Sequence, residues 1–314
     1  MSAIDVKKLA MFTGHRNSIF AMVHGREPSV FYSAGSDGMI VQWVMNEPDQ
    51  GKLIARVPNT VYTLCYLQDS HQLVVGQNFD GIHFIDLHTN KEIASLQLTK
   101  SAIFDIKYDL GKLWVATGEG ELIVIKHESL SIEKRIKISE KSLRKLALHP
   151  NGFEIAAGYS DHAIRIFSLL DHTLLKEITT AHTNSVFSLA YTPNGQYLLS
   201  GGRDAHLKIW ETKNYTCFED IVGHMYTIND ITFMESGAYF ATCSKDKSIK
   251  VWHGTAFKLL KVIDKARYAG HGTSVNKLIW LGTNNHLISA SDDNTISIWD
   301  LQMNLVKINA ILGK

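Results

Sequence analysis

The same spacing of four residue types recurs along this chain and restricts the folds that the chain can adopt. His182 is followed by Ser200 after 18 residues, by Asp204 after 22 and by Trp210 after 28. The complete sets are His15, Ser33, Asp37 and Trp43; His182, Ser200, Asp204 and Trp210; His224, Thr242, Asp246 and Trp252; and His271, Ser289, Asp293 and Trp299. Four residue types at fixed offsets in four copies indicate one structural unit that is used repeatedly.

Each unit consists of short apolar runs separated by turn sequences. Between His182 and Trp210, the runs Val186–Tyr191 and Tyr197–Ser200 are separated by a Pro-Asn-Gly sequence. Turns this short join neighbouring antiparallel strands. A further run lies between each Trp and the next His, so the unit is predicted to be a four-stranded antiparallel sheet. Such a unit cannot bury its apolar face alone and must pack against copies of itself.

Three weaker copies lie between the first and second complete sets. They place Ile85, Ile125 and Phe167 at the Trp position, so successive Trp-position residues are separated by 42, 40, 42, 43, 42 and 47 residues. A period of about 40–45 residues built from strands is typical of propeller blades. The sequence therefore predicts an all-β fold, a seven-bladed β-propeller of four-stranded antiparallel sheets, as one domain over residues 1–314. The predicted blades are 14–58, 59–98, 99–138, 139–180, 181–222, 223–264 and 270–314, with 4–13 closing the last one.

The sequence resembles the WD-repeat β-propeller family. Gly-His pairs open three of the complete sets, at Gly14, Gly223 and Gly270, and the Trp-Asp pair occurs once, at Trp299-Asp300. The resemblance implies that each set forms a hydrogen-bonded tetrad that fastens the three inner strands together. The chemistry agrees, because a Ser or Thr hydroxyl can accept the buried Trp N–H and donate to the His, which donates to the Asp. A catalytic triad is disfavoured, because an active site does not need four copies.

The middle blades depart from this pattern. Their tetrad His positions hold Val57, Gln97 and Ser139, whereas turn acids remain at Asp80, Glu119 and Asp161. We expect these blades to be held by apolar packing alone.

Two segments compete for the outermost strand of the last blade. Asp5–Phe12 runs directly into Gly14, as the outer strands of other blades run into the next Gly-His pair. Leu305–Leu312 follows Trp299 where an outer strand is also expected. We favour the N-terminal segment, because ring closure removes exposed sheet edges. The C-terminal segment is then an extra edge strand or packs on the surface, and no helix is predicted.

The composition and the absence of certain motifs disfavour several functional classes. The formal net charge of +1, with 32 Lys and Arg against 31 Asp and Glu, predicts no obligatory nucleic acid or membrane partner. No apolar run reaches the ~20 residues that span a bilayer, and we expect no secretory signal. Cys65, Cys217 and Cys243 lack paired spacing, so we expect reduced thiols and a cytoplasmic location. No metal-ligand spacing and no phosphate loop are present, so we expect neither a metal nor a cofactor.

The resemblance implies that partners bind at the top mouth of the central channel. The positions it implicates are the residue after the first apolar anchor of each inner strand and the residue before each turn acid. The former are Phe20, Tyr62, Phe104, Arg144, Phe187, Asn229 and Asn276; the latter include Arg203, Lys245 and Asp292. The interval from Trp252 to His271 is five residues longer than that from Trp210 to His224, and this insertion adds Arg267 and Tyr268. Aromatic side chains and Arg are enriched in binding hot spots.

The sequence therefore predicts a non-catalytic scaffold that binds an extended or acidic segment of another protein at this mouth. One alternative is that the aromatic side chains only plug a narrow channel or turn into the blade core. Another is a propeller enzyme, a hydrolase or lyase, which needs an acid and a base converging on the mouth. A third is a structural subunit of a larger complex that uses the blade sides. The oligomeric state is left open.

Overall fold

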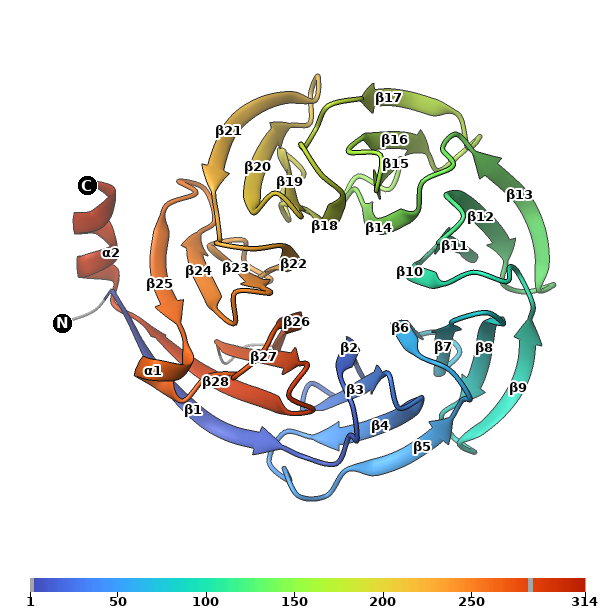
Figure 1. Ribbon diagram of the computed structural model, residues 1–314, viewed down its shortest axis with the longest axis horizontal. Coiled ribbons are helices and arrows are strands. Elements are labelled where there is room, and N and C mark those ends of the chain that lie inside the picture. The colour runs from blue at the N-terminus through green and yellow to red at the C-terminus, as the bar shows by residue number, and fades with distance from the viewer. Residues whose placement is uncertain (1–2, 282–284, 314) are drawn as a thin grey trace.

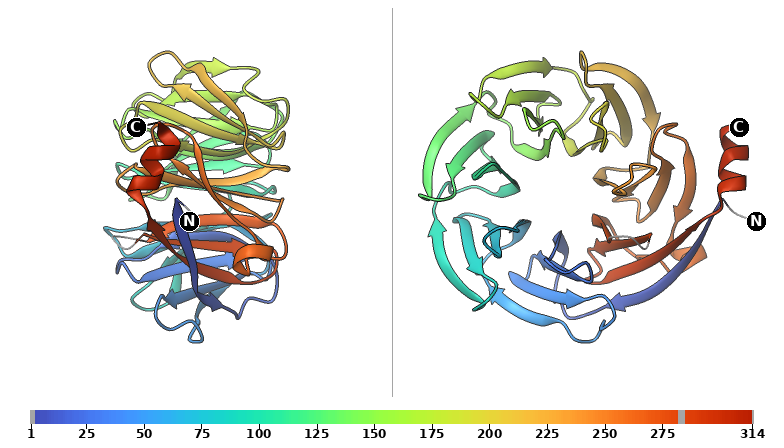
Figure 2. Two further views of the ribbon diagram at one scale, coloured as in Figure 1. Left: turned by 90° about the vertical axis from the view of Figure 1, so that its left-hand side faces the viewer. Right: turned by 180° about the vertical axis from the view of Figure 1, so that it is seen from behind.

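The computed structural model describes residues 3–281 and 285–313. In this part of the chain, the strands form seven four-stranded antiparallel sheets arranged radially around a central axis, as Figures 1 and 2 show. The predicted all-β, seven-bladed propeller is confirmed. Residues 282–284 and 314 of the predicted seventh blade lie outside the described residues.

The first four blades each follow the chain from the inner to the outer strand. Blade 1 contains β2 (Ile19–His24), β3 (Val30–Gly35), β4 (Met39–Val44) and β5 (Lys52–Arg56). Blade 2 contains β6 (Val61–Leu67), β7 (Gln72–Gln77), β8 (Gly81–Asp86) and β9 (Lys91–Leu96). Blade 3 contains β10 (Ile103–Asp109), β11 (Lys112–Thr117), β12 (Glu121–Lys126) and β13 (Ser131–Lys137). Blade 4 contains β14 (Leu143–Leu148), β15 (Glu154–Tyr159), β16 (Ile164–Ser168) and β17 (Leu174–Ile178).

The last three blades complete the ring. Blade 5 contains β18 (Val186–Tyr191), β19 (Tyr197–Gly202), β20 (His206–Glu211) and β21 (Thr216–Val222). Blade 6 contains β22 (Ile228–Phe233), β23 (Tyr239–Ser244), β24 (Ile249–His253) and β25 (Leu259–Ile263). Blade 7 contains β26 (Val275–Leu281), β27 (His286–Ser291) and β28 (Ile296–Met303), with β1 (Ile4–Phe12) as its outermost strand. The helices are α1 (Lys265–Tyr268) and α2 (Leu305–Leu312).

The N-terminal segment closes the ring, as predicted. β1 pairs with β28 from Ile4, opposite Met303, to Phe12, opposite Ile296. The C-terminal segment forms a helix on the outside of the ring (Figure 1). Of its two predicted alternatives, the extra edge strand was wrong and packing on the surface is confirmed, because Ile308 is buried against the ring. The edge of the sheet is already occupied by β1, and the chain after β28 turns into a helix instead.

Local capping explains why both helices form where none was predicted. In α2, the Asn304 side chain accepts the backbone N–H of Lys307, and Ile308 is buried against the cluster between blades 6 and 7. In α1, the Asp264 side chain accepts the N–H of Arg267. An N-terminal cap of this kind stabilises a helix by about 1 kcal/mol, which is enough to favour a helical turn in a short loop.

The apolar cores lie between blades. Among the described residues, buried apolar side chains form seven clusters, one for each pair of neighbouring blades. Each tetrad Trp packs toward the preceding blade: Trp43 joins a cluster with Ile288 and Ile298 of blade 7, for example. Each blade is therefore stabilised by packing against its two neighbours.

Polar contacts also hold two of the middle blades, which corrects the prediction of apolar packing alone. In blade 4, Arg165 is only 6% exposed and lies 2.9 Å from the Asp161 carboxylate and 2.7 Å from that of Glu177. The pairing of β16 with β17 places Arg165 opposite Glu177. In blade 2, Gln77 Nε2 donates to the turn acid Asp80 over 2.9 Å. Asp80 and Asp161 thus keep partners although the tetrad His is missing.

Candidate functional site

The four residues of each complete set meet as a bonded tetrad. In blade 5, Nε1 of Trp210 donates to Ser200 Oγ over 2.9 Å, and this hydroxyl lies 2.7 Å from His182 Nε2. Nδ1 of His182 lies 3.0 Å from Asp204 Oδ1. In blades 1, 6 and 7, the Trp-to-hydroxyl distances are 2.7, 2.9 and 2.8 Å. The corresponding hydroxyl-to-His distances are 2.7, 2.8 and 2.8 Å.

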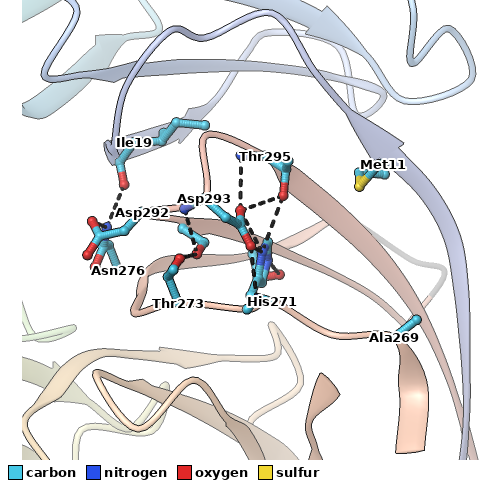
Figure 3. Close-up of polar contacts among 12 residues, drawn as sticks. Met11, Ile19, Ala269, His271, Thr273, Asn276, Asp292, Asp293 and Thr295 are labelled. Carbon is cyan, nitrogen blue, oxygen red and sulfur yellow. Dashed lines mark hydrogen bonds and ion pairs between the residues drawn. The ribbon is translucent and has the colours of Figure 1, made fainter. Parts of the chain in front are cut away.

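The tetrad Asp also fixes the loop that leads into the channel mouth. The Asp204 carboxylate accepts the backbone N–H groups of Thr183 and His206 over 2.8 and 3.2 Å. Burial raises the pKa of Asp204, but the hydrogen bond from His182 and these two N–H groups hold it well below its ordinary value. Figure 3 shows the equivalent contacts around Asp293 in blade 7. An ionised carboxylate thus anchors the start of the inner strand.

Each inner strand begins with a β-bulge. In β18, the register with β19 shifts between Val186 and Ser188. The same shift follows the first residue of β2, β6, β10, β14, β22 and β26. A bulge leaves one residue unpaired and re-aims its side chain. That residue is the one after the apolar anchor, so the bulge determines which way the predicted mouth residues point.

These unpaired residues form a ring that we call the collar. Its members are Phe20, Tyr62, Phe104, Arg144, Phe187, Asn229 and Asn276. All of them are partly exposed and line one cavity of about 310 Å³. The structure therefore brings residues from all seven inner strands together in the wall of one cavity.

The collar from blade 1 to blade 5 is a continuous arc of π surface. The ring centroid of Tyr62 lies 5.1 Å from that of Phe20 and 5.4 Å from that of Phe104. The Arg144 guanidinium lies 4.3 Å from the centroid of Phe104 and 5.1 Å from that of Phe187. Cation–π contacts of this kind contribute about 0.5–1 kcal/mol each at exposed sites. They therefore help to fix the positions of the Phe104 and Phe187 rings in the cavity wall.

The two amides of the collar join blades. Asn229 Nδ2 donates to the Val275 carbonyl over 2.8 Å, which links blade 6 to blade 7. Asn276 Nδ2 donates to the Ile19 carbonyl over 3.0 Å and to Asp292 Oδ1 over 2.8 Å, as Figure 3 shows. This side of the collar is therefore structural, whereas the aromatic side faces the cavity without such bonds.

In six blades the residue before the turn acid lies beside the collar, because its N–H donates to the carbonyl of the residue that precedes the anchor. These bonds join Ser36 to Ser18, Gly118 to Ala102, Ser160 to Ser142, Arg203 to Ser185, Lys245 to Thr227 and Asp292 to Ser274, and in blade 2 Asn78, two residues before Asp80, makes the equivalent bond to Thr60. The structure thus places Arg203, Lys245 and Asp292 on the rim of the mouth. Arg203 and Lys245 are exposed, so this rim is basic over blades 5 and 6.

Arg267 and Tyr268 do not lie at the mouth, which corrects their predicted position. The helical turn α1 lies at the outer edge of the ring beside β1 (Figure 1). The Arg267 guanidinium pairs with Asp264 at 2.9 Å, and Tyr268 packs on the cluster between blades 6 and 7. The insertion follows the outermost strand, β25, so it folds over outer strands and not toward the channel.

A set of charged side chains, which sequence reasoning missed, lines the cavity below the collar. We call Asp105, Lys107, Lys145, Asp230 and Lys277 the charged floor. Lys145 Nζ lies 3.4 Å from Asp105 and 3.7 Å from Asp230, and Lys277 Nζ lies 2.8 Å from Asp230. Lys145 of blade 4 therefore links blade 3 to blade 6 across the channel. Strand alternation alone does not predict them, because the bulge after each anchor shifts the alternation and turns the residues two and four places after the anchor toward the channel.

Pairing keeps most of the charged floor ionised at neutral pH. Burial raises the pKa of Asp105, but the ammonium groups of Lys107 and Lys145 lower it to about 2. Burial lowers the pKa of Lys145, yet the carboxylates of Asp105 and Asp230 raise it above its ordinary value. For Lys277, burial outweighs the attraction of Asp230, and its pKa is lowered.

Other site types find little support in residues 3–281 and 285–313. No three His, Cys, Asp or Glu side chains are grouped there so that they could hold a metal ion. None of the helices in these ranges has the length and apolar character that a membrane span requires. Cys65, Cys217 and Cys243 are free thiols.

Comparison with known proteins agrees with the tetrads. The family model of the WD domain, G-beta repeat, matches residues 6–43, 173–211, 215–253 and 263–300. Each matched segment ends at or next to a tetrad Trp. The chain belongs to the WD-repeat β-propeller family. The unmatched region covers the middle blades, where the tetrad His and Trp are absent.

Relatives of this propeller are considerably longer than the aligned region. Striatin from Rattus norvegicus is 24% identical over 283 residues, which cover 80% of this chain and 36% of striatin. Protein HIR1 from Cryptococcus neoformans var. neoformans is 25% identical over 193 residues, which cover 53% of this chain and 21% of the relative. Protein hir1 from Schizosaccharomyces pombe is 29% identical over 189 residues, which cover 50% and 20%. None of these names denotes an enzyme.

Proposed function

We propose that this propeller is a non-catalytic interaction scaffold that captures a segment of another protein at the channel mouth. The observation that carries this proposal is the cavity of about 310 Å³ beneath the collar, whose wall includes Phe20, Tyr62, Phe104 and Phe187. Binding cavities typically measure about 300–1,000 Å³ and are lined by apolar and aromatic groups with a few polar ones. Aromatic side chains bury much area and lose little conformational freedom on binding.

The rim beside the collar supports an extended partner segment. On blade 6, Met225 and Tyr226 are 82% and 59% exposed, next to the tetrad His224. The exposed basic side chains of Arg203 and Lys245 lie on the same face. A segment that carries apolar and acidic residues would complement this combination.

The enzyme alternative is less well supported. The charged floor contains both carboxylates and amines, as an acid–base mechanism needs. However, an efficient general acid or base has a pKa near the working pH. The pKa of Asp105 is lowered to about 2 and that of Lys145 is raised, so neither group exchanges protons readily at neutral pH. Burial lowers the pKa of Lys277, but its ammonium group pairs with the Asp230 carboxylate at 2.8 Å.

A second candidate function, a subunit of a larger complex, is favoured by the exposed face of α2. Leu305 and Val306 are 65% and 80% exposed on the outside of the ring. A double substitution, Leu305→Ser with Val306→Ser, tests this interface separately from the mouth. A cytoplasmic location is also part of the proposal; the three free thiols support it, and cell fractionation tests it.

The test of the mouth is affinity capture from the native cell extract with a triple variant, Phe20→Ala, Phe187→Ala and Arg203→Ala. We expect proteins retained by the wild type to be lost, while the melting temperature changes by only about 2–4 °C, because all three side chains are partly or fully exposed.

A matched control carries Phe153→Ala, Leu170→Ala and Lys213→Ala. These side chains lie in turns on the opposite face, and Phe153 and Leu170 are 69% and 85% exposed. The control should retain the same proteins as the wild type. If the variant with Phe20, Phe187 and Arg203 replaced also retains these proteins, the mouth is not the binding site.

A further inference from the structure

The cavity beneath the collar concentrates positive charge. Among the described residues that line it, the cationic side chains are Lys107, Arg144, Lys145 and Lys277, and the anionic ones are Asp105 and Asp230. The formal charge of the cavity is therefore +2, although that of the whole chain is only +1. An excess of like charge in a partly enclosed cavity is unfavourable unless an anion enters it.

The two carboxylates are already well bonded. Asp105 accepts the backbone N–H of Leu146 over 3.0 Å, and Asp230 accepts that of Leu278 over 3.1 Å. Asp230 also pairs with Lys277 at 2.8 Å. Both carboxylates are almost completely buried. Their bonds and burial therefore hold both carboxylates in place in the cavity wall.

Two of the ammonium groups are bonded less closely. Lys145 Nζ lies 3.4 and 3.7 Å from its carboxylate neighbours, and Lys107 Nζ lies 3.7 Å from Asp105. A charge-assisted N–H···O bond is about 2.7–2.9 Å long. An ammonium group has three donors, so Lys107 and Lys145 retain capacity to bind another oxygen.

We propose that this cavity binds a carboxylate at the end of an apolar stem, such as an acidic side chain of the captured segment, with the stem against the collar and the carboxylate on Lys107 and Lys145. This inference rests on the proposed function, because it assigns a chemistry to the part of the segment that enters the cavity. The aromatic arc of Phe20, Tyr62 and Phe104 supplies the apolar wall. The charged floor lies beyond the collar residues of β10, β14, β22 and β26.

A carboxylate suits the cavity better than a phosphate. The ammonium groups of Lys145 and Lys277 already bind carboxylates. A phosphate group carries a charge of about −1.5 to −2 at neutral pH and is attracted by the formal charge of +2, but inorganic phosphate brings no apolar group to contact the aromatic arc. The apolar wall also favours an anion that brings its own hydrocarbon stem.

The direct test uses small probes on the intact protein. Hydrocinnamate, its uncharged amide and inorganic phosphate are titrated separately, with binding followed by saturation-transfer NMR at low and high salt. We expect hydrocinnamate to bind about tenfold more tightly than the amide and more tightly than phosphate, and to weaken at high salt. Equal binding of the acid and the amide, or tighter binding of phosphate, would overturn the proposal.

Variants locate the site. Lys145→Gln and Lys107→Gln should each weaken hydrocinnamate binding about three- to tenfold and leave the binding of the amide unchanged. A double variant, Lys277→Gln with Asp230→Asn, removes one charge of each sign and should keep the preference for the anion. Lys107 is one-third exposed, so its variant remains informative if Lys145→Gln fails to fold. Unchanged hydrocinnamate binding in folded Lys107→Gln would place the probe elsewhere and contradict the proposal.

These outcomes separate the two proposals. If hydrocinnamate binds no more tightly than its amide, but the triple variant at Phe20, Phe187 and Arg203 loses its partners in affinity capture, the carboxylate site is wrong and the scaffold function stands. If hydrocinnamate binds as described but the triple variant at Phe20, Phe187 and Arg203 keeps its partners, the anion site stands and partner capture at the mouth is wrong.

Discussion

The side-chain amide of Asn276 donates to the backbone carbonyl of Ile19 over 3.0 Å and thereby joins the last inner strand to the first. At the outer edge, β1 pairs with β28, so the ring is closed at two radii. The inner closure lies in the collar, where the proposed partner enters. Binding at the mouth and integrity of the ring therefore share one residue.

Asn276→Ala should lower the free energy of unfolding by about 1 kcal/mol, because one hydrogen bond between blades is lost at a site that water can reach. Urea unfolding measures this. Asn229→Ala, which removes the equivalent bond to Val275, should cost a similar amount. A much larger loss for Asn276 alone would mean that ring closure depends on this one bond.

Phe12→Ala should destabilise the protein by about 3–5 kcal/mol. Phe12 is 1% exposed, and its ring lies 5.5 Å from Phe31 and 5.4 Å from Trp43. The neighbouring Met11 on the same strand is 48% exposed, so Met11→Ala should change the stability by less than about 0.5 kcal/mol. Thermal unfolding of the two variants compares them, and equal effects would argue against β1 as the strand that seals the ring.

Ser200→Ala should cost about 2–3 kcal/mol, because it leaves both the Trp210 N–H and His182 Nε2 without their partner inside a buried tetrad. Ser200→Thr keeps the hydroxyl, as Thr242 does in blade 6, and should be close to the wild type. Denaturant unfolding distinguishes these results. If both substitutions are neutral, the tetrad does not stabilise blade 5.

Arg165→Met should destabilise blade 4 by about 2 kcal/mol, because it leaves the half-buried carboxylates of Asp161 and Glu177 unpaired. Adding Asp161→Asn and Glu177→Gln removes those charges and should recover part of the loss. This non-additivity is measured by comparing the single, double and triple variants in urea. Strict additivity would mean that the ion pairs contribute nothing to stability.

Stability should fall on acidification in two stages. Burial lowers the pKa of His224, so its protonation favours the unfolded chain and stability is lost as the pH falls below about 6.5. Burial raises the pKa of Asp246, but the interactions with His224, Ser248 and the Met225 N–H together hold it below its ordinary value, so further stability is lost below about pH 4. Urea unfolding from pH 8 to pH 3 measures both stages.

Asp246→Asn should reduce the second stage, since the group that is protonated there is gone. Constant stability between pH 7 and pH 5 would contradict the buried, neutral state of His224.

The order of the blades and the tetrads could be predicted from the sequence because both depend on local, repeated spacing. Ser200 and Trp210 are ten residues apart on paired strands, so an offset in the chain translates directly into a contact. Arg267 and Tyr268 were placed wrongly at the mouth, because an insertion has no repeat that defines its direction. Leu305–Leu312 was expected to be a strand or surface segment, and its helix depends on a cap and on one buried residue.

The sequence by itself determined the number of blades, the tetrads and the collar positions, since each follows from a fixed period and the alternation of strands. Only the tertiary structure decided that Lys145, Asp105 and Asp230 meet in one cavity. Asp105 and Asp230 lie on different blades and far apart in the chain, so no local pattern relates them. Their contact exists because ring closure brings inner strands from blades 3, 4 and 6 to a common axis, where charges of opposite sign come within a few ångströms.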